Sequence, residues 1–413
     1  MRGKLSSDGT SAVYDNLGAV SLALKHLFWC LRWPYMPIFV TLVTRLMISA
    51  QVLASFSLQR FWGTNETGAV AASLVAGRGF ASPYDASQPT AWLAPGYPFL
   101  VSLVFQIFGV HSSATTWVLI AFNTLCAAFT CAVIYFLGRK YFGELSGILG
   151  AWLWALCLQD AVMPLTMWDP SLSALLFGLA FLLIPALEHS ERARTWLGAG
   201  LLAGTASLVN PALLGPAPFM AGYLVFFRQR QGRRTLGRLA SAILMFVLSL
   251  LPWTIRNYQR FGEIFFVRSN FAAEVYYANL GYASHPRGPS REYQMLGEKE
   301  YLRQKEHLAL GFLRHHPSDF FKHSAQRWTR FWVTPAFSMY WLLMSLLGWV
   351  GLTFAVKDLR ARSLPFVFAL LVFPLTYCVT LVFPKYRHPL EPVMFVLAGY
   401  AVGRHHTRGG AFI

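Results

Sequence analysis

The chain has 413 residues, of which 55% are hydrophobic and only 13% are charged. Soluble globular proteins carry about 45–50% apolar and about 25% charged residues, so this composition excludes one large soluble domain, and it also excludes a disordered or a fibrous chain. Apolar segments long enough to cross a bilayer recur from end to end. The sequence therefore predicts an all-α, polytopic integral membrane protein.

The balance of 35 Lys and Arg against 18 Asp and Glu gives a net charge of +17. In a soluble chain such an excess suggests binding to nucleic acid. Here much of it lies in short loops between apolar segments, where basic residues set membrane orientation and meet anionic lipids. We therefore expect no nucleic-acid partner. The five cysteines are interpreted as packing residues, without a disulfide or a metal.

Residues 1–35 are polar and then mildly amphipathic, without a signal-peptide pattern, and we expect them to be cytoplasmic. About ten apolar segments follow that we expect to cross the membrane. They comprise residues 36–58, 112–137, 144–160, 170–187, 195–209, 212–227, 238–255, 336–356, 364–383 and 388–404. Residues 405–413 form a cytoplasmic tail.

The apolar segment 95–109 decides the topology. It begins with Pro95-Gly-Tyr-Pro98 and is shorter than the roughly 20 residues that a helix needs to cross a bilayer, so we interpret it as a half-helix or an interfacial helix. The basic clusters between the spans then all fall on one side, at residues 139–140, 192–194, 228–238, 357–362 and 404–408. By the positive-inside rule this side is cytoplasmic, and both termini lie there.

Two substantial segments remain outside. Residues 59–111 form a loop within an N-terminal transmembrane module of residues 36–255, and residues 256–335 precede the C-terminal helices of 336–404. Within the second loop, residues 316–332 fit an amphipathic helix at the membrane surface. No soluble catalytic domain is expected, and the phosphate-binding pattern Gly-x4-Gly-Lys-Ser/Thr does not occur.

Carboxylates on the outer face are scarce, and two of them are candidates for catalysis. Glu66 follows the first span, and Asp169 begins the fourth. A carboxylate at the membrane surface can take a proton from an acceptor hydroxyl. The alternative is structural: Glu66 would stabilise the N-terminus of a helix over 66–77, and Asp169 would cap the helix that starts with Pro170. Both interpretations stay open for each residue.

Basic residues gather on the same face. Lys385, Arg387 and His388 join the last two spans, and Arg256 and Arg268 follow the seventh. Such side chains suit a phosphate, which Arg binds with two hydrogen bonds and Lys as a point charge. The alternative is that their charged ends simply reach the membrane surface. Glu391, inside the last span, is expected to pair with Arg387 one turn earlier.

The order of several motifs resembles that of the membrane-embedded GT-C glycosyltransferases. The resemblance is greatest to bacterial relatives of the dolichyl-phosphate-mannose–protein mannosyltransferases and the aminoarabinose transferases, and it covers most of residues 36–404. The motifs are Glu66…Gly77-Arg-Gly-Phe80, Pro89-Thr-Ala-Trp92, Pro95-Gly-Tyr-Pro98, Trp168-Asp-Pro-Ser-Leu-Ser173, Pro252-Trp-Thr-Ile-Arg256, Arg268-Ser-Asn270 and Arg387-His-Pro-Leu-Glu391.

The resemblance implies an inverting transferase that moves a sugar from a polyprenyl-phosphate donor to an acceptor hydroxyl, at the extracytoplasmic face of a bacterial inner membrane. It implies Glu66 as the general base and Asp169 as a second catalytic acid. Many relatives carry an Asp-Glu pair where this chain has Asn65-Glu66, so one acid is missing. The expected phosphate ligands are Arg256, Arg268, Lys385, Arg387 and His388, and the expected substrate contacts are Asn65, Trp92, Tyr97 and Asn270.

Two other functions remain open. A transporter or flippase of lipid-linked sugars would place functional polar groups through the depth of the membrane, whereas only Arg45 and Glu391 stand out there. A ligase that moves a whole glycan from a lipid carrier would share the expected site. We expect no cofactor. Some GT-C relatives use a divalent metal, but one strong acid in each loop provides few carboxylate ligands for such an ion. The acceptor can be a protein, a lipid or a glycan.

Overall fold

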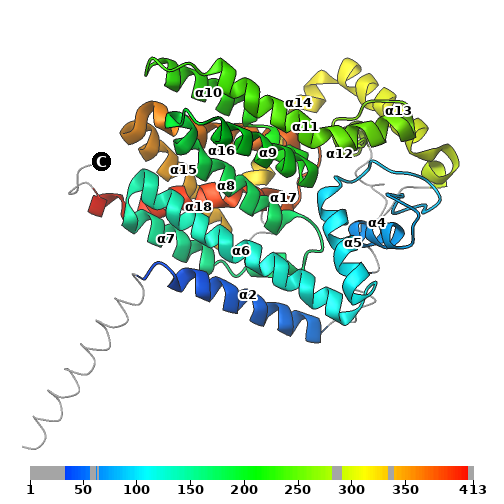
Figure 1. The fold of residues 1–413 in the computed structure, drawn as a ribbon, viewed down its shortest axis with the longest axis horizontal. Coiled ribbons are helices and arrows are strands. Elements are labelled where there is room, and N and C mark those ends of the chain that lie inside the picture. Colours follow the sequence, from blue (N-terminus) through cyan, green and yellow to red (C-terminus); the bar gives the residue numbers. More distant parts are fainter. Residues whose placement is uncertain (1–32, 56–61, 63–64, 281–290, 334–338, 408–413) are drawn as a thin grey trace, which may run out of the picture.

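The computed structural model describes residues 33–55, 62, 65–280, 291–333 and 339–407. Within these ranges every regular element is a helix, apart from one isolated bridge between Ala81 and Pro89 (Figure 1). The predicted all-α architecture is confirmed.

A helix overlaps each of the ten predicted spans. These helices are α2 (Met36–Ala54), α6 (Ser113–Phe142), α7 (Glu144–Ala155), α8 (Pro170–His189), α9 (Ala193–Val209), α10 (Ala217–Gln229), α11 (Leu236–Phe261), α15 (Met339–Leu359), α16 (Leu364–Val379) and α18 (Glu391–Thr407). Five described segments are long and apolar enough to cross a membrane: 36–54, 113–142, 170–189, 236–261 and 339–379. The protein is therefore an integral membrane protein, and the number of ten spans stays a prediction.

Helix boundaries differ from the predicted spans at several places. The span expected over 144–160 ends at Ala155, and the chain continues into the 3-10 helix η1 (Asp160–Leu165), which contains Pro164. The span expected over 212–227 is split into η2 (Pro211–Leu214) and α10, because Pro216 begins a new helix. These breaks leave polar residues at the ends of the helices.

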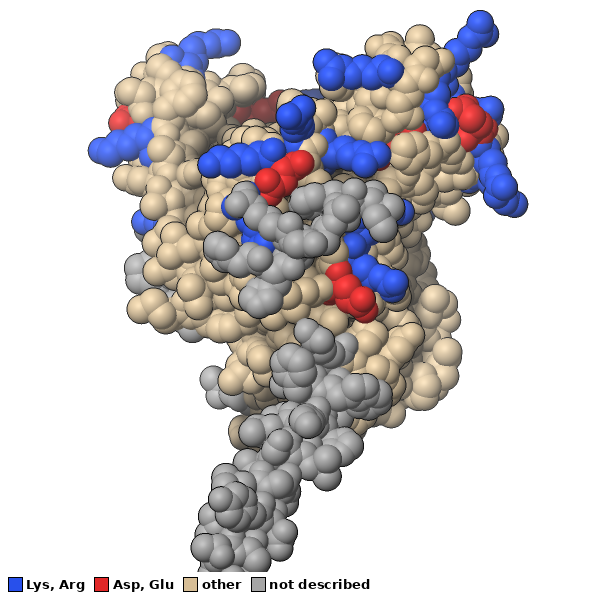
Figure 2. Space-filling model, turned by 90° about the vertical axis from the view of Figure 1, so that its left-hand side faces the viewer, with Lys and Arg blue, Asp and Glu red and all other residues tan. Residues whose placement is uncertain are grey.

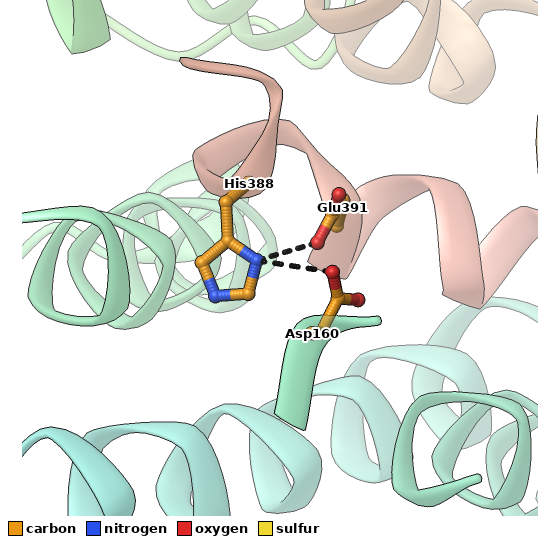
Figure 3. Close-up of side chains that lie close together, drawn as sticks. All are labelled: Asp160, His388 and Glu391. Carbon is orange, nitrogen blue, oxygen red and sulfur yellow. Dashed lines mark hydrogen bonds and ion pairs between the residues drawn. The ribbon is translucent and has the colours of Figure 1, made fainter. Parts of the chain in front are cut away.

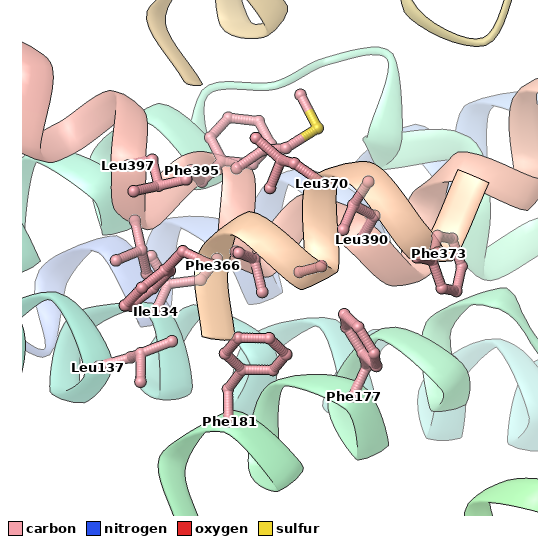
Figure 4. Packing of buried hydrophobic residues seen from close by; sticks show 14 of the residues in the cluster. Ile134, Leu137, Phe177, Phe181, Phe366, Leu370, Phe373, Leu390, Phe395 and Leu397 are labelled. Atoms are coloured by element: carbon pink, nitrogen blue, oxygen red, sulfur yellow. The ribbon is translucent and has the colours of Figure 1, made fainter. Parts of the chain in front are cut away.

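The core of the bundle forms around α18, whose residues 393–398 are all buried. Close contact with its neighbours depends on two glycines: a Cβ atom on Gly351 of α15 would lie 2.0 Å from the carbonyl oxygen of Leu397, and one on Gly399 would lie 2.5 Å from the amide of Gly150 in α7. Aromatic side chains such as Phe177 and Phe366 fill the space between α8 and α16 (Figure 4). This rigid core fixes the positions at which the helices end.

Several helices of the two loops gather at one end of the bundle, at the right of Figure 1. They include α4 (Glu66–Val75) and α5 (Gly96–Phe108) from the first loop, and α12 (Phe271–Asn279) and α13 (Arg291–His315) from the second. Segment 95–109 is indeed a short helix, and the helix predicted over 316–332 is α14 (Pro317–Trp332).

The opposite end of the bundle is basic. Figure 2 shows many Lys and Arg side chains and few Asp and Glu on this face, where α6 and α18 end (left in Figure 1). The last turn of α6 contains Arg139 and Lys140. The excess of positive charge thus lies away from the end that carries the loop helices.

Candidate functional site

A cavity of about 300 Å³ lies where the loop helices meet the transmembrane bundle. It is bounded by the starts of α4, α5 and α8, the end of α9 and the segments around Arg268 and Lys385. Its polar lining residues come from six parts of the chain and include Thr67, Tyr97, Asp169, Asn210, Arg268, Asn270, Glu274, Thr376 and Lys385. The predicted residues Asp169, Arg268, Lys385, Tyr97 and Asn270 are therefore brought together here.

Asp169 is the most deeply buried of the acidic residues that line this cavity. Its carboxylate Oδ2 accepts hydrogen bonds from Ser173 Oγ at 2.6 Å and from Asn210 Nδ2 at 3.0 Å, and the residue is only 7% exposed. It makes no capping hydrogen bond to the first amides of α8. Burial raises the pKa of Asp169, although Ser173, Lys385 and Arg268 act in the other direction. The carboxylate therefore lines the cavity and does not cap the N-terminus of α8.

Two cations stand beside Asp169. Lys385 belongs to the short helix α17 (Pro384–Arg387), and its Nζ lies 3.9 Å from the centre of the Trp168 ring. Burial lowers the pKa of Lys385, whereas the charges of Asp169 and Glu66 raise it. Arg268 donates from Nε to the carbonyl oxygen of Trp92 at 2.9 Å, which holds its guanidinium at the wall of the cavity. The site thus presents two positive charges next to one buried carboxylate.

Glu66 is the first residue of α4 and lies at the edge of the cavity, which its neighbour Thr67 lines. Its carboxylate accepts a hydrogen bond from the hydroxyl of Tyr84. Burial and the charge of Glu66 raise the pKa of Tyr84, so this hydroxyl keeps its proton. Asn65 acts as the N-cap of α4, because its side chain accepts a hydrogen bond from the Gly68 amide at 2.9 Å. This structural role explains the presence of Asn65 without a contact to substrate.

A third carboxylate was missed by the sequence analysis. Glu274 lies on α12 in the second loop and lines the cavity, and its Oε1 accepts a hydrogen bond from Asn270 Nδ2 at 3.0 Å. Asn210, the partner of Asp169, was missed as well. The spacing of Asn270 and Glu274, one helical turn apart, is the only signal that could have drawn attention to Glu274.

Glu298 of α13 joins the two loops behind the cavity. This carboxylate is 3% exposed and accepts hydrogen bonds from the Ala91 amide at 2.7 Å, from Ser269 Oγ at 2.7 Å and from Tyr293 Oη at 2.8 Å, as well as from the Thr90 hydroxyl. Ser269 directly precedes Asn270 and follows Arg268. The segment that contains Arg268 and Asn270 is thereby fixed to the first loop.

Two predicted residues of the outer face have structural surroundings instead. The Arg256 guanidinium donates to the carbonyl oxygens of Thr90 at 2.7 Å and Phe80 at 2.8 Å, and it does not line the cavity. Trp92 is buried, and its ring packs edge-on against those of Tyr84 and Tyr293. The structure therefore separates both residues from the cavity in which they were expected.

Arg387 and His388 also lie outside the cavity and are buried; Figure 3 shows His388 facing Asp160 and Glu391. His388 Nδ1 lies 2.6 Å from Glu391 Oε2 and 3.7 Å from Asp160 Oδ1, and its ring stacks on Trp154. Arg387 packs over the Trp341 ring instead of forming the ion pair expected with Glu391. A phosphate in the cavity does not reach these residues.

The ligand atoms of Asp160, His388 and Glu391 lie within 4.8 Å of one another, close enough to hold one metal ion. Arg45 and Arg387 interact electrostatically with both carboxylates. Two guanidinium groups already balance two carboxylates, so a divalent ion would add two uncompensated charges to a buried site. The charges of this cluster suit an internal ion network better than a metal site.

Comparison with known proteins agrees with this architecture. The family model for dolichyl-phosphate-mannose-protein mannosyltransferases matches residues 87–253, which include Asp169. An archaeal oligosaccharyltransferase, AglB from Archaeoglobus fulgidus in complex with an inhibitory peptide and a dolichol-phosphate, has the same fold, with a TM-score of 0.56 at 15% identity over 92% of this chain and 52% of its own. The predicted resemblance to the dolichyl-phosphate-mannose–protein mannosyltransferases is confirmed over residues 87–253.

Further matches define the extent of this likeness. The oligosaccharyltransferase from Archaeoglobus fulgidus in its apo form matches with a TM-score of 0.51 at 14% identity, covering 91% of this chain and 51% of its own. ArnT from Cupriavidus metallidurans bound to undecaprenyl phosphate matches at 14% identity over 82% of this chain and 73% of its own, with a TM-score of 0.37. The chain thus spans about half the length of the archaeal enzyme. No curated protein matches the sequence.

Proposed function

We propose that the chain transfers a single sugar from a polyprenyl-phosphate donor to an acceptor hydroxyl in the cavity around Asp169. The observation that carries this proposal is the placement of one buried carboxylate beside Lys385 and Arg268. A carboxylate can remove the proton of the attacking hydroxyl, and the two cations can stabilise the phosphate as it leaves.

An apolar groove adjoining the cavity supports a lipid-linked donor. This groove measures about 590 Å³, and it is lined by apolar residues of α8, α9, η2, α10 and α11 and by Phe266. Phe266 also lines the catalytic cavity, two residues before Arg268. A polyprenyl chain in the groove would carry its phosphate to Arg268 and Lys385.

The reaction follows from this arrangement. The acceptor oxygen attacks the anomeric carbon from the side opposite to the phosphate, so the bond to the phosphate oxygen breaks with inversion. The proton of the acceptor passes to a carboxylate, and the polyprenyl phosphate leaves with its negative charge beside Lys385 and Arg268. Of the two acids expected from the sequence, Asp169 lines the cavity and Glu66 stands at its edge. We therefore assign the base to Asp169, with Glu66 as the alternative.

The size of the cavity favours one sugar over a whole glycan. At about 300 Å³ it is at the lower end of the range of ligand sites. We also propose that it lies on the extracytoplasmic face of a bacterial inner membrane. The basic end of the bundle lies opposite to the loop helices (Figures 1 and 2), which supports the extracytoplasmic side by the positive-inside rule.

The test is to incubate the purified protein with a panel of polyprenyl-phosphate sugars and to measure released polyprenyl phosphate by mass spectrometry. We expect release with at least one donor, and none with the Asp169→Asn variant. If no donor is cleaved but the protein moves such lipids across liposome membranes, the chain is a transporter and the proposal is wrong.

A further inference from the structure

A second cavity, of about 660 Å³, lies on the other side of α5 from the catalytic cavity. Pro95, Gly96 and Phe99 line it, whereas Tyr97 and Pro98 line the catalytic cavity. The first turn of α5 thus forms a wall between the two. The proposed transferase reaction makes no use of this second cavity.

Three arginines line the second cavity: Arg78, Arg256 and Arg260. No acidic residue lines it among the residues that the structure describes. The hydrogen bonds of Arg256 go to the neutral oxygens of Phe80, Thr90 and Asn257. Glu298 acts on Arg256 electrostatically from behind the first loop, so about two positive charges remain uncompensated.

The arginines of α11 share one face with polar and apolar lining residues. Ser249, Trp253, Arg256 and Arg260 follow one another at helical spacing and line the cavity. Large apolar residues on the rest of α11 are exposed, among them Val247, Leu251 and Ile255 at 43–49%. In an integral membrane protein such a surface meets lipid tails. The cavity therefore lies beside the hydrocarbon core of the membrane. Its charged residues lie at the C-terminal end of α11, where this helix leaves the hydrocarbon core.

The cavity is amphipathic along its length. Leu74, Phe99, Leu208 and Trp253 form apolar walls, and Arg78 and Arg260 stand exposed at the polar end. A ligand that fits must combine negative charge with an apolar chain. Guanidinium groups bind phosphate oxygens with paired hydrogen bonds.

We propose that this second cavity binds the phosphate of an anionic lipid through Arg78 and Arg260, with one acyl chain against Trp253 and Leu208. Arg256 contributes its charge while its hydrogen bonds hold the first loop. The ligand is a phosphate-bearing lipid rather than free phosphate, because the apolar walls remain exposed to water when only an ion is bound.

The experiment measures binding of phosphatidylglycerol to the detergent-purified full chain by native mass spectrometry. The double variant Arg78→Gln/Arg260→Gln is compared with the wild type and with a matched control, Arg291→Gln/Arg314→Gln, which removes two exposed arginines of α13. Because each basic residue near a membrane surface adds about 1 kcal/mol of attraction to anionic lipid, we expect the double variant to bind about 30-fold more weakly. The control should bind as the wild type does.

Two further measurements distinguish the binding of a phosphate-bearing lipid from the binding of free phosphate. Phosphatidylcholine, which has no net charge, should bind far more weakly than phosphatidylglycerol, and inorganic phosphate alone should not compete at millimolar concentration. Equal binding of phosphatidylglycerol to the double variant and the wild type would overturn the proposal. Competition by inorganic phosphate would overturn the assignment to a lipid. Neither result bears on the release of polyprenyl phosphate, so the proposed transferase function is tested independently.

Discussion

Two groups of buried charges in this molecule are built from the same residue types and are used differently. Around Asp169, the carboxylate and the cations Lys385 and Arg268 face an open cavity. Around Asp160, a carboxylate, a histidine and Arg387 are sealed among tryptophans. Lys385 and Arg387 are two residues apart in the chain and belong to different groups. Access to a cavity, rather than the presence of charge, distinguishes the proposed reactive site from the sealed cluster.

Removing the carboxylate charge of Asp169 should have the largest effect and is the strongest test of this comparison. Asp169→Asn should lower kcat by about 10²- to 10⁴-fold, because it removes general base catalysis, and thermal unfolding in detergent should change little. Glu66→Gln, the matched variant, should lower it far less. Transfer assays on both variants decide between the acids: full activity in Asp169→Asn with loss in Glu66→Gln would assign the base to Glu66.

Removing a carboxylate from the sealed group should affect stability instead. Glu391→Ala leaves Asp160 as the remaining carboxylate for His388 and the nearby arginines, and breaking such a buried pair costs about 3–5 kcal/mol. Denaturant unfolding in detergent micelles measures this loss. Glu300→Ala on α13, whose side chain is 48% exposed beside Arg303, serves as the control and should cost less than about 1 kcal/mol. A stable Glu391→Ala protein would contradict the structural role.

Lys385 and Arg387, which are two residues apart in the chain, should differ in their effect on donor binding. Lys385→Gln removes a charged partner of the phosphate, which is worth about 1.5–3 kcal/mol, so the Kd for the polyprenyl-phosphate sugar should rise about 10- to 100-fold. Arg387→Gln should leave this Kd unchanged and lower stability. Equal donor affinity in the wild type and Lys385→Gln would remove the lysine from the site.

The smallest effect concerns pH. Burial raises the pKa of Asp169 above its usual value, and a general base must be deprotonated, so kcat/KM should fall on acidification through a pKa above about 3.9. Because Lys385 lowers this pKa, the Lys385→Gln variant should lose activity at a higher pH than the wild type. Profiles of kcat/KM against pH for both proteins measure the shift; an unchanged acid limb would contradict the coupling.

The helices were predictable because long apolar segments bounded by polar residues leave few alternatives in a membrane. The short segment 95–109 and the surface helix over 316–332 followed from length and amphipathicity. Asp169 was singled out because carboxylates on the expected outer face are scarce, and Arg268 and Lys385 because basic residues gather on the same face. The sequence could not separate Lys385 from Arg387, since the direction of each side chain depends on how the four-residue helix α17 is packed.

Glu274 and Asn210 were not predicted for a related reason. Both reach the cavity only through the tertiary arrangement: Glu274 on α12 and Asn210 at the end of α9 approach Asp169 from distant parts of the chain. Trp92 and Asn65 were expected to touch substrate because they stand in the motifs of the first loop. They hold that loop in shape, and sequence position alone does not distinguish the two roles.

The four hydrogen bonds to Glu298 limit how the site can exchange its reactants. Two of these bonds, from the Thr90 hydroxyl and the Ala91 amide, come from the first loop, so a state in which the two loops separate must break both of them, and each such bond contributes about 1.5–3 kcal/mol. Separation of the loops is therefore thermodynamically unfavourable. A transferase of the proposed kind avoids this loss only if its reactants enter and leave while the two loops stay joined at Glu298.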